Sequence, residues 1–146
     1  MADITQGSYG STATVLSTEL NSIADAASSD ASSEIDNTTD LHMFDDLVLS
    51  VTFGSAPTAS EPIELYLLPA IDGTNFVTGS SSITPPLNTL RGVFTVQNTT
   101  SAQLVTLMNV AIPPGKFKYM ITNNSGQAFP ASGSTLERRP HSFEQL

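Results

Sequence analysis

The clearest alternation of apolar and polar residues runs from Leu104 to Asn124. A period of two with one apolar side predicts strands of a half-buried sheet. Pro113-Pro114-Gly115 interrupts the pattern, and because these residues end a strand and reverse the chain, we predict an antiparallel hairpin with a tight turn. The apolar side is expected to comprise Leu104, Met108, Val110 and Ile112 in the first strand, and Phe117, Tyr119 and Ile121 in the second.

Shorter alternating segments predict further strands. The clearest is Phe44 to Phe53, followed by Ile63 to Leu67, Arg91 to Val96 and Thr135 to Phe143. In the first of these, the residues expected to face the core are Leu47, Leu49, Val51 and Phe53. Pro140 favours an edge position for the last strand, because proline cannot donate to a neighbour. Two segments stay open: residues 12–24 fit a helix or a strand, and residues 26–36 fit a weak strand or disorder.

The remaining segments are expected to be loops. Residues 74–90 form a long one, which in a compact domain is usually functional or mobile. Phe129-Pro130 should fold back as an anchor. Because each one-faced sheet must bury its apolar side, seven or eight short strands favour an all-β, antiparallel β-sandwich that is jelly-roll-like. We expect residues 1–10 to form an extended N-terminal arm and residues 11–146 to form a single β-sandwich domain.

Composition narrows the classes of partner that the chain is expected to bind. The 146 residues carry a net charge of −9, and all five Lys and Arg lie at or after Arg91. This argues against nucleic acid, which needs clustered basic residues. No apolar run is long enough to span a membrane, and residues 1–10 do not resemble a secretion signal. The chain has no cysteine, which suits synthesis in a reducing cytoplasm.

Candidate chemistry is sparse. The histidines are His42 and His141, and His42-x-x-Asp45-Asp46 could offer metal ligands, although a solvated strand entrance explains it more simply. The aspartate-containing segments 36–40 and 72–75 lack the spaced carboxylates of a calcium loop and fit Asx-turns better. With no tryptophan, the weak sugar-binding candidates are Tyr9, Tyr66 and Phe76, of which Tyr66 is on the expected solvent side of its strand. We therefore predict no catalytic, cofactor-binding or metal-binding residue and no enzyme activity.

Several longer segments carry a family resemblance. IELYLLPAIDGTNF and PPGKFKYMITNNSGQAFPASGSTL are the most telling, with LSTELNSIADAASSDASSEIDNTTDL in support. Together they resemble a group of small virion proteins of tailed bacteriophages. The resemblance implies a jelly-roll-like cement or decoration protein that binds the major capsid protein on the outside of the capsid, after synthesis in the host bacterial cytoplasm. No functional residue is carried over from that family.

If the resemblance holds, we expect a dimer or trimer on the shell, with contacts from Met1 to Tyr9, Thr74 to Leu90, and Arg138 with Arg139. Two other classes stay open. One is a glycan- or receptor-binding module of the particle, suggested by the long loops of the sandwich. The other is a tail or head-completion component, which is also β-rich.

Overall fold

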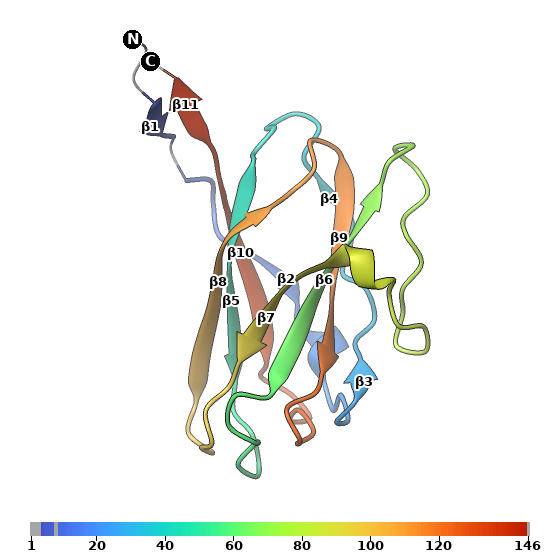
Figure 1. The fold of residues 1–146 in the computed structure, drawn as a ribbon, viewed down its shortest axis with the longest axis vertical. Helices are drawn as coiled ribbons and strands as arrows, with labels where there is room; N and C mark the ends of the chain where they lie inside the picture. The colour runs from blue at the N-terminus through green and yellow to red at the C-terminus, as the bar shows by residue number, and fades with distance from the viewer. Residues whose placement is uncertain (1–3, 8, 146) are drawn as a thin grey trace.

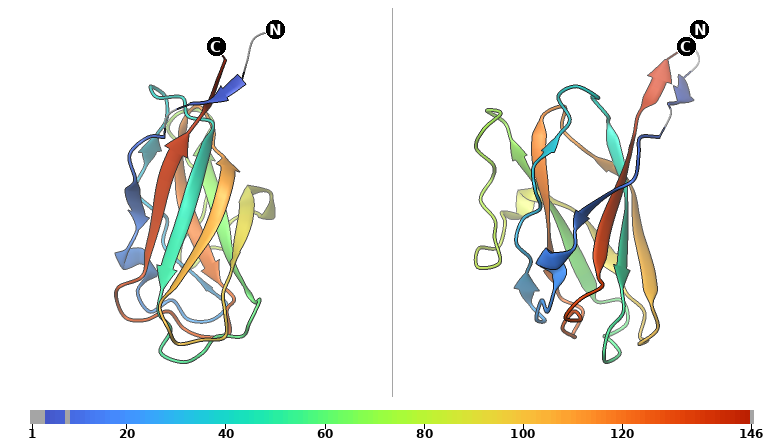
Figure 2. Two further views of the ribbon diagram at one scale, coloured as in Figure 1. Left: turned by 90° about the vertical axis from the view of Figure 1, so that its left-hand side faces the viewer. Right: turned by 180° about the vertical axis from the view of Figure 1, so that it is seen from behind.

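The computed structural model describes residues 4–7 and 9–145, which form two antiparallel sheets packed face to face (Figures 1 and 2). The first sheet has the order β2-β10-β5-β8, with β2 Ala13–Leu16, β10 Thr135–His141, β5 Phe44–Val51 and β8 Gln103–Ala111. The second has the order β3-β9-β6-β7, with β3 Ala27–Ser28, β9 Lys116–Asn123, β6 Pro62–Ala70 and β7 Leu90–Thr95, and with β4 Ile35–Asp36 also paired to β9. Two 3-10 turns, η1 Thr18–Leu20 and η2 Leu87–Thr89, complete the body.

The predicted antiparallel β-sandwich is confirmed, and its core follows the alternation. The inward residues Leu47, Leu49, Val51 and Phe53 are buried, as are Phe117, Tyr119 and Ile121 across the interior. Phe129 is also buried, with its ring centroid 5.6 Å from that of Phe53, so the predicted anchor is confirmed. The two sheets hold nine strands in the described residues, against the seven or eight expected. The jelly-roll-like connectivity stays a prediction.

The structure decides between the alternatives that the sequence leaves for residues 12–24 and 26–36. Residues 13–20 form β2 and then η1, which buries Leu16 and Leu20 in the core. Residues 27–36 run along β9 as two short strands. Between them, Ser29 and Ser32 extend the pairing, because their hydroxyl oxygens accept the backbone N–H groups of Ile121 at 3.1 Å and Tyr119 at 2.9 Å.

The predicted inward side of β8 is wrong for its first half. Leu104 and Met108 are exposed, whereas Val110 and Ile112 are buried. The cause is a β-bulge: Asp45 pairs with Val110 but Leu47 pairs with Leu107, so β8 holds one more residue than β5. Asn109 takes a left-handed φ of 56° there, and one inserted residue shifts every earlier side chain to the opposite face.

The predicted hairpin between residues 104 and 124 is also wrong. β8 pairs with β5 in the first sheet, and β9 pairs with β6 in the second. Pro113-Pro114-Gly115 therefore carries the chain across the sandwich and does not join two paired strands. Alternation identifies the side of a strand that faces the core, and two strands facing one core from opposite sheets carry the same pattern.

β10 is a central strand, not an edge strand as Pro140 suggested. Gly10 donates its N–H to the Pro140 carbonyl at 2.8 Å, so Pro140 directs its backbone groups away from β5. In an antiparallel strand the N–H and C=O of one residue point to the same neighbour. The missing donor of Pro140 thus lies beyond the end of β2, whose pairing with β10 stops at Arg138.

Both ends of the described chain leave the body together. β1 (Ile4–Gln6) and β11 (Phe143–Gln145) form a two-stranded antiparallel ribbon, with Ile4 opposite Gln145. Figures 1 and 2 show this ribbon projecting beyond one end of the sandwich. β11 follows β10 after one residue, so the ribbon continues the line of a central strand.

Candidate interaction surfaces

An aromatic cluster holds the root of the ribbon. The buried ring of His141 has its centroid 5.1 Å from that of Tyr9 and 5.6 Å from that of Phe44. Phe143 packs edge-on against Phe44 at 5.5 Å. The guanidinium of Arg139 lies 4.3 Å from the Tyr9 ring centroid, within cation–π range. These contacts fix the segment around Tyr9 against β10 at the base of the ribbon.

Polar contacts fix the same ring from the β8 side. His141 Nε2 lies 3.0 Å from Asn109 Oδ1, and the Asn109 N–H donates to Asp46 Oδ1 at 2.8 Å. The Asp46 Oδ2 atom is 3.9 Å from His141 Nδ1. The bulge in β8 thus has a positional role, because it presents the Asn109 side chain to the root of the ribbon.

A buried ionic bridge lies beneath this cluster. Asp45 is fully buried on β5, and Arg138 on β10 donates to both of its carboxylate oxygens through Nε at 3.0 and 2.9 Å and through Nη2 at 2.7 Å. Tyr119 on β9 donates its hydroxyl to Asp45 Oδ2 at 2.7 Å. Burial raises the pKa of Tyr119 well above its ordinary value, so this hydroxyl stays a donor. The bridge connects the two sheets at the ribbon end.

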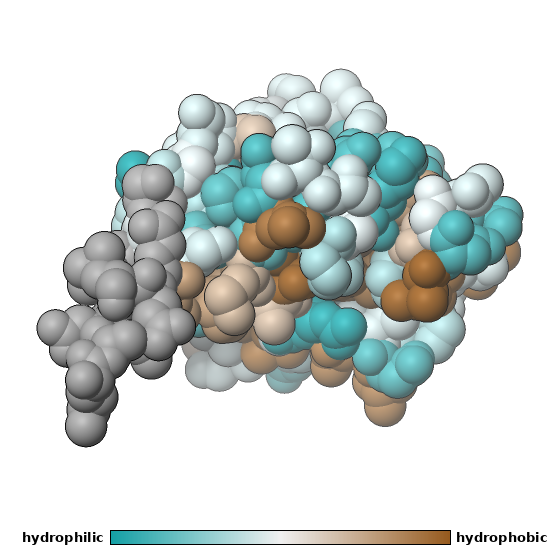
Figure 3. Space-filling view, turned by 90° about the horizontal axis from the view of Figure 1, so that it is seen from above, coloured by the Kyte–Doolittle hydropathy of each residue, from teal (hydrophilic) through white to brown (hydrophobic). Residues whose placement is uncertain are grey.

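Apolar side chains are exposed around this end. One groove is lined by Leu41, His42, Met43, Phe44, Ala111, Ile112 and Pro114, and a second by Leu67, Pro69, Ile71, Arg91, Ala111, Ile112 and Pro113. The grooves share Ala111 and Ile112, so they form one surface. We call its exposed apolar members Leu41, Met43, Ile71, Ala111 and Pro114 the ribbon-end patch. Figure 3 looks onto this end and shows brown side chains among teal and white ones.

The structure separates the residues considered for metal binding. Asp45 points into the core and Asp46 to the opposite face, so His42, Asp45 and Asp46 do not converge. Among the described residues, no group of three or more His, Asp or Glu side chains is placed to hold a metal ion. The predicted Asx-turns are confirmed: Asp36 accepts the Thr38 N–H, and Asp72 accepts those of Thr74 and Asn75. A hydrogen bond from the Asn75 side-chain amide to Asp72, followed by the N–H groups of Asn75 and Thr74, lowers the pKa of Asp72 to about 2.

The loop of residues 74–90 covers the outer face of the second sheet. Tyr66 is therefore not a solvent-facing residue as expected; only 3% of it is exposed, in a small cluster with Leu68, Met120 and Val77. Burial and a hydrogen bond to Glu64 raise the pKa of Tyr66 to about 12. Ser81 donates to Asp30 from its N–H at 3.0 Å and its hydroxyl at 2.7 Å, and Lys118 lies 4.5 Å from the Phe76 ring centroid.

In two of the three expected contact regions, the structure leaves fewer residues exposed for contact than the sequence suggests. Arg138 is committed to Asp45, so only Arg139 of that pair is exposed. The loop of residues 74–90 is held to the body, although Ile83 and Leu87 remain exposed on it. In the arm, residues 1–3 and 8 lie outside the described residues, and the rest joins the ribbon and its root.

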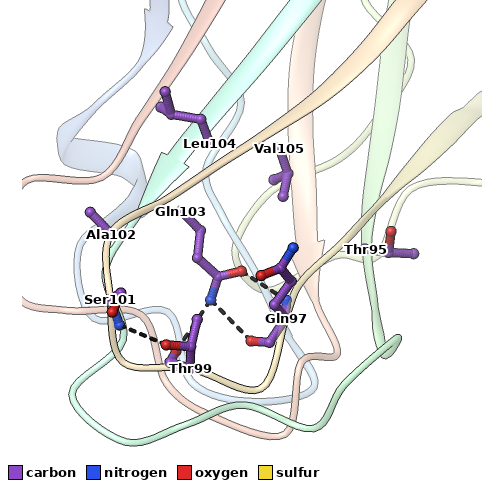
Figure 4. Close-up of a pocket in the computed structure, with 8 residues that line it drawn as sticks. All are labelled: Thr95, Gln97, Thr99, Ser101, Ala102, Gln103, Leu104 and Val105. Atoms are coloured by element: carbon purple, nitrogen blue, oxygen red, sulfur yellow. Dashed lines mark hydrogen bonds between the residues drawn. The ribbon is translucent and has the colours of Figure 1, made fainter.

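A further hollow lies at the other end, where residues 96–102 connect β7 to β8 (Figure 4). Its centre is the buried carboxamide of Gln103. The Oε1 atom accepts the Gln97 N–H at 2.8 Å, and Nε2 donates to the carbonyls of Gln97 at 3.0 Å and Thr99 at 3.2 Å. The side chain thus takes the place of a paired strand and closes the turn. The hydrogen-bonding groups of Gln103 therefore stabilise the connection between β7 and β8.

Comparison with known proteins identifies no relative: no family model, no curated protein and no solved structure matches the chain. In the described residues, no helix is long and apolar enough to cross a membrane. Fold and surface together define a class, an antiparallel β-sandwich whose two chain ends form a projecting ribbon beside an exposed apolar patch. The resemblance to phage virion proteins stays a prediction.

Proposed function

We propose that this chain is a non-enzymatic structural protein of a phage particle that binds the outside of the capsid lattice and stabilises it. The observation that carries the proposal is the ribbon of β1 and β11, which extends away from the core (Figure 2). A two-stranded ribbon is at best marginally stable in water by itself. Docking on another protein would stabilise the ribbon, which would then act as a contact element.

The ribbon-end patch supports the same orientation. Leu41 and Met43 are about half exposed, at 54% and 50%, and Ile71 is 87% exposed. Contiguous exposed apolar surface with a polar rim is typical of protein interaction sites. In the proposal this end faces the major capsid protein, the ribbon reaches over the adjoining subunit, and the sandwich stands outward. Such a protein localises to the capsid surface of the virion.

The strand order supports a jelly-roll topology, which we include in the proposal. If β3 and β4 count as one interrupted strand, each sheet has four strands, and of the connections from β2 to β10 only β6 to β7 stays within one sheet. The chain changes sheet at β2 to β3, β4 to β5, β5 to β6, β7 to β8, β8 to β9 and β9 to β10. Repeated crossing between two four-stranded sheets is the arrangement of a double Greek key. Jelly rolls are common in capsid proteins, which agrees with the resemblance.

Co-sedimentation with phage shells stripped of the protein tests the proposal. We expect saturable binding of the full chain and greater heat resistance of the loaded shells. Removal of residues 1–6 should weaken binding, as should Met43→Asp in the patch. The matched control is Val93→Asp, since Val93 is 40% exposed on β7 and lies outside both the patch and the expected contact regions. Equal binding by Met43→Asp and Val93→Asp would show that the patch is not the contact.

Two outcomes would favour the other classes. Absence of binding to stripped shells, together with labelling of one vertex or the tail in intact particles, would favour a tail or head-completion component. Binding on a glycan array would favour a receptor-binding module. Labelling spread over the whole head would support the capsid role.

A further inference from the structure

β8 is the outermost strand of the first sheet, as the left view of Figure 2 shows, and in the described part of the chain it pairs only with β5. An edge strand directs the N–H and C=O groups of alternate residues away from its own sheet. Soluble proteins usually protect such edges by shortness, charge, proline or a covering segment.

The other edges of the sandwich follow that rule. β2 has four residues, β3 and β4 have two each, and β7 has six with Arg91 among them. β8 is different, because its nine residues, QLVTLMNVA, include no charge and no proline. A chain with a net charge of −9 thus presents its longest edge as a neutral one.

Exposed apolar side chains accompany these backbone groups. Leu104 is 74% exposed and Met108 66% exposed on the outer face of the sheet. On the inner face, Val105 and Leu107 pack on the core but are only partly buried. Free backbone groups between two apolar rows form a site for another extended strand, which would add to the sheet edge.

The order of residues in β8 identifies the strand that fits. Around Thr106 the sequence is symmetric in character: Val105 and Leu107 flank it on one face, and Leu104 and Met108 on the other. When such a strand pairs antiparallel with itself about Thr106, Leu104 lies opposite Met108 and Val105 opposite Leu107. All of these cross-strand pairs are apolar, which stabilises an antiparallel ladder. The bulge at Asn109 ends the regular stretch.

We propose that β8 pairs antiparallel with β8 of a second copy of this chain, with a two-fold axis at Thr106. The first sheets of the two copies then continue into one another across the dimer. A two-fold interface uses the same patch on both copies, and a strand without charge avoids the like-charge contacts that two acidic chains would otherwise make. The dimer leaves the ribbon end free, and it does not depend on the proposed capsid role.

A single cysteine tests the axis, because the natural chain has none. Residues directly opposite in an antiparallel pair have Cα atoms about 4.5–5.5 Å apart, which suits a disulfide. Thr106→Cys is therefore expected to cross-link into a covalent dimer under mild oxidation. The matched control is Thr14→Cys, an exposed threonine on β2 at the opposite edge of the same sheet. In a preformed pair the local thiol concentration is of millimolar order, so at about 10 μM protein Thr106→Cys should react about 100-fold faster.

Sedimentation equilibrium of the unmodified chain gives an independent readout. We expect a dimer that Thr106→Asp converts to a folded monomer, because two carboxylates would meet at the axis, whereas Thr14→Asp stays dimeric. A wild-type monomer at about 100 μM, a dimeric Thr106→Asp, or equal cross-linking rates for the two cysteine variants would overturn the proposal. Shell binding is measured separately, so monomeric Thr106→Asp that still binds shells would leave the capsid role intact.

Discussion

Replacement of Arg138 by methionine tests whether the buried bridge holds the two sheets together. Arg138 donates three hydrogen bonds to Asp45, and Tyr119 donates one from the opposite sheet. Methionine keeps most of the apolar length of the arginine but removes the cation. The Asp45 carboxylate, which has no exposed surface, would then be buried with the tyrosine hydroxyl as its one remaining partner from this bridge.

Loss of one partner of a buried ion pair costs about 3–5 kcal/mol, chiefly because the other charge is left unpaired. With a urea dependence of about 2 kcal/mol per molar for a chain of this size, the unfolding midpoint should fall by roughly 2 M. Equilibrium denaturation followed by circular dichroism measures this shift. The slope should not change, since the two end states bury similar surface.

The matched control is Lys116→Met, which breaks the exposed pair between Lys116 Nζ and Glu34 Oε1 at 2.8 Å. Exposed pairs contribute at most about 1 kcal/mol. A second variant, Asp45→Leu with Tyr119→Phe and Arg138→Met, removes the whole bridge and should be more stable than Arg138→Met alone, because no unpaired charge remains. If Arg138→Met lowers the midpoint no more than Lys116→Met does, the bridge is not a stabilising element.

Three further predictions concern single residues. Tyr66→Ala should cost about 3 kcal/mol in urea denaturation, because the side chain is buried under the loop; an exposed tyrosine would cost under about 0.5 kcal/mol. Leu41→Asn should raise the free energy of unfolding by about 0.5–1 kcal/mol, because Leu41 has a φ of 52° that asparagine tolerates better; no gain would argue against strain there. From pH about 10 to 12, stability should fall by about 1.4 kcal/mol per pH unit for Tyr66, since the unfolded chain loses that proton first; Tyr66→Phe should flatten this slope.

The prediction from sequence succeeded where alternation runs unbroken. In β5 the pattern of Leu47, Leu49 and Val51 matched the buried side, because one face of that strand meets the core along its whole length. In β8 the same reasoning failed for Leu104 and Met108. A one-residue bulge leaves no composition signal except Asn109, which accepts a left-handed φ more readily than most residues do.

Other errors came from long-range packing. Tyr66 alternates like a surface residue, and it is buried because a distant segment lies over its strand. Pro140 is compatible with a central strand because β2 ends before reaching it. In the buried bridge, Asp45 is separated from Tyr119 by 74 positions and from Arg138 by 93 positions in the sequence. No local spacing predicts such a pairing. The sequence neighbours of Asp45 suggest a metal ligand, whereas its partners Tyr119 and Arg138 come from two other strands.

The projecting ribbon and the β8 edge are two separate candidate contact surfaces of the same protein. The ribbon extends one central strand beyond the core, and its root is fixed by His141, Tyr9 and Arg139. The β8 edge lies along the side of the sandwich and carries its apolar residues away from that root. Because Asn109 both ends the regular part of β8 and contacts His141, one bulge separates the two surfaces. Mutations that weaken β8 pairing should therefore leave ribbon contacts unchanged, whereas a change at Asn109 should affect both.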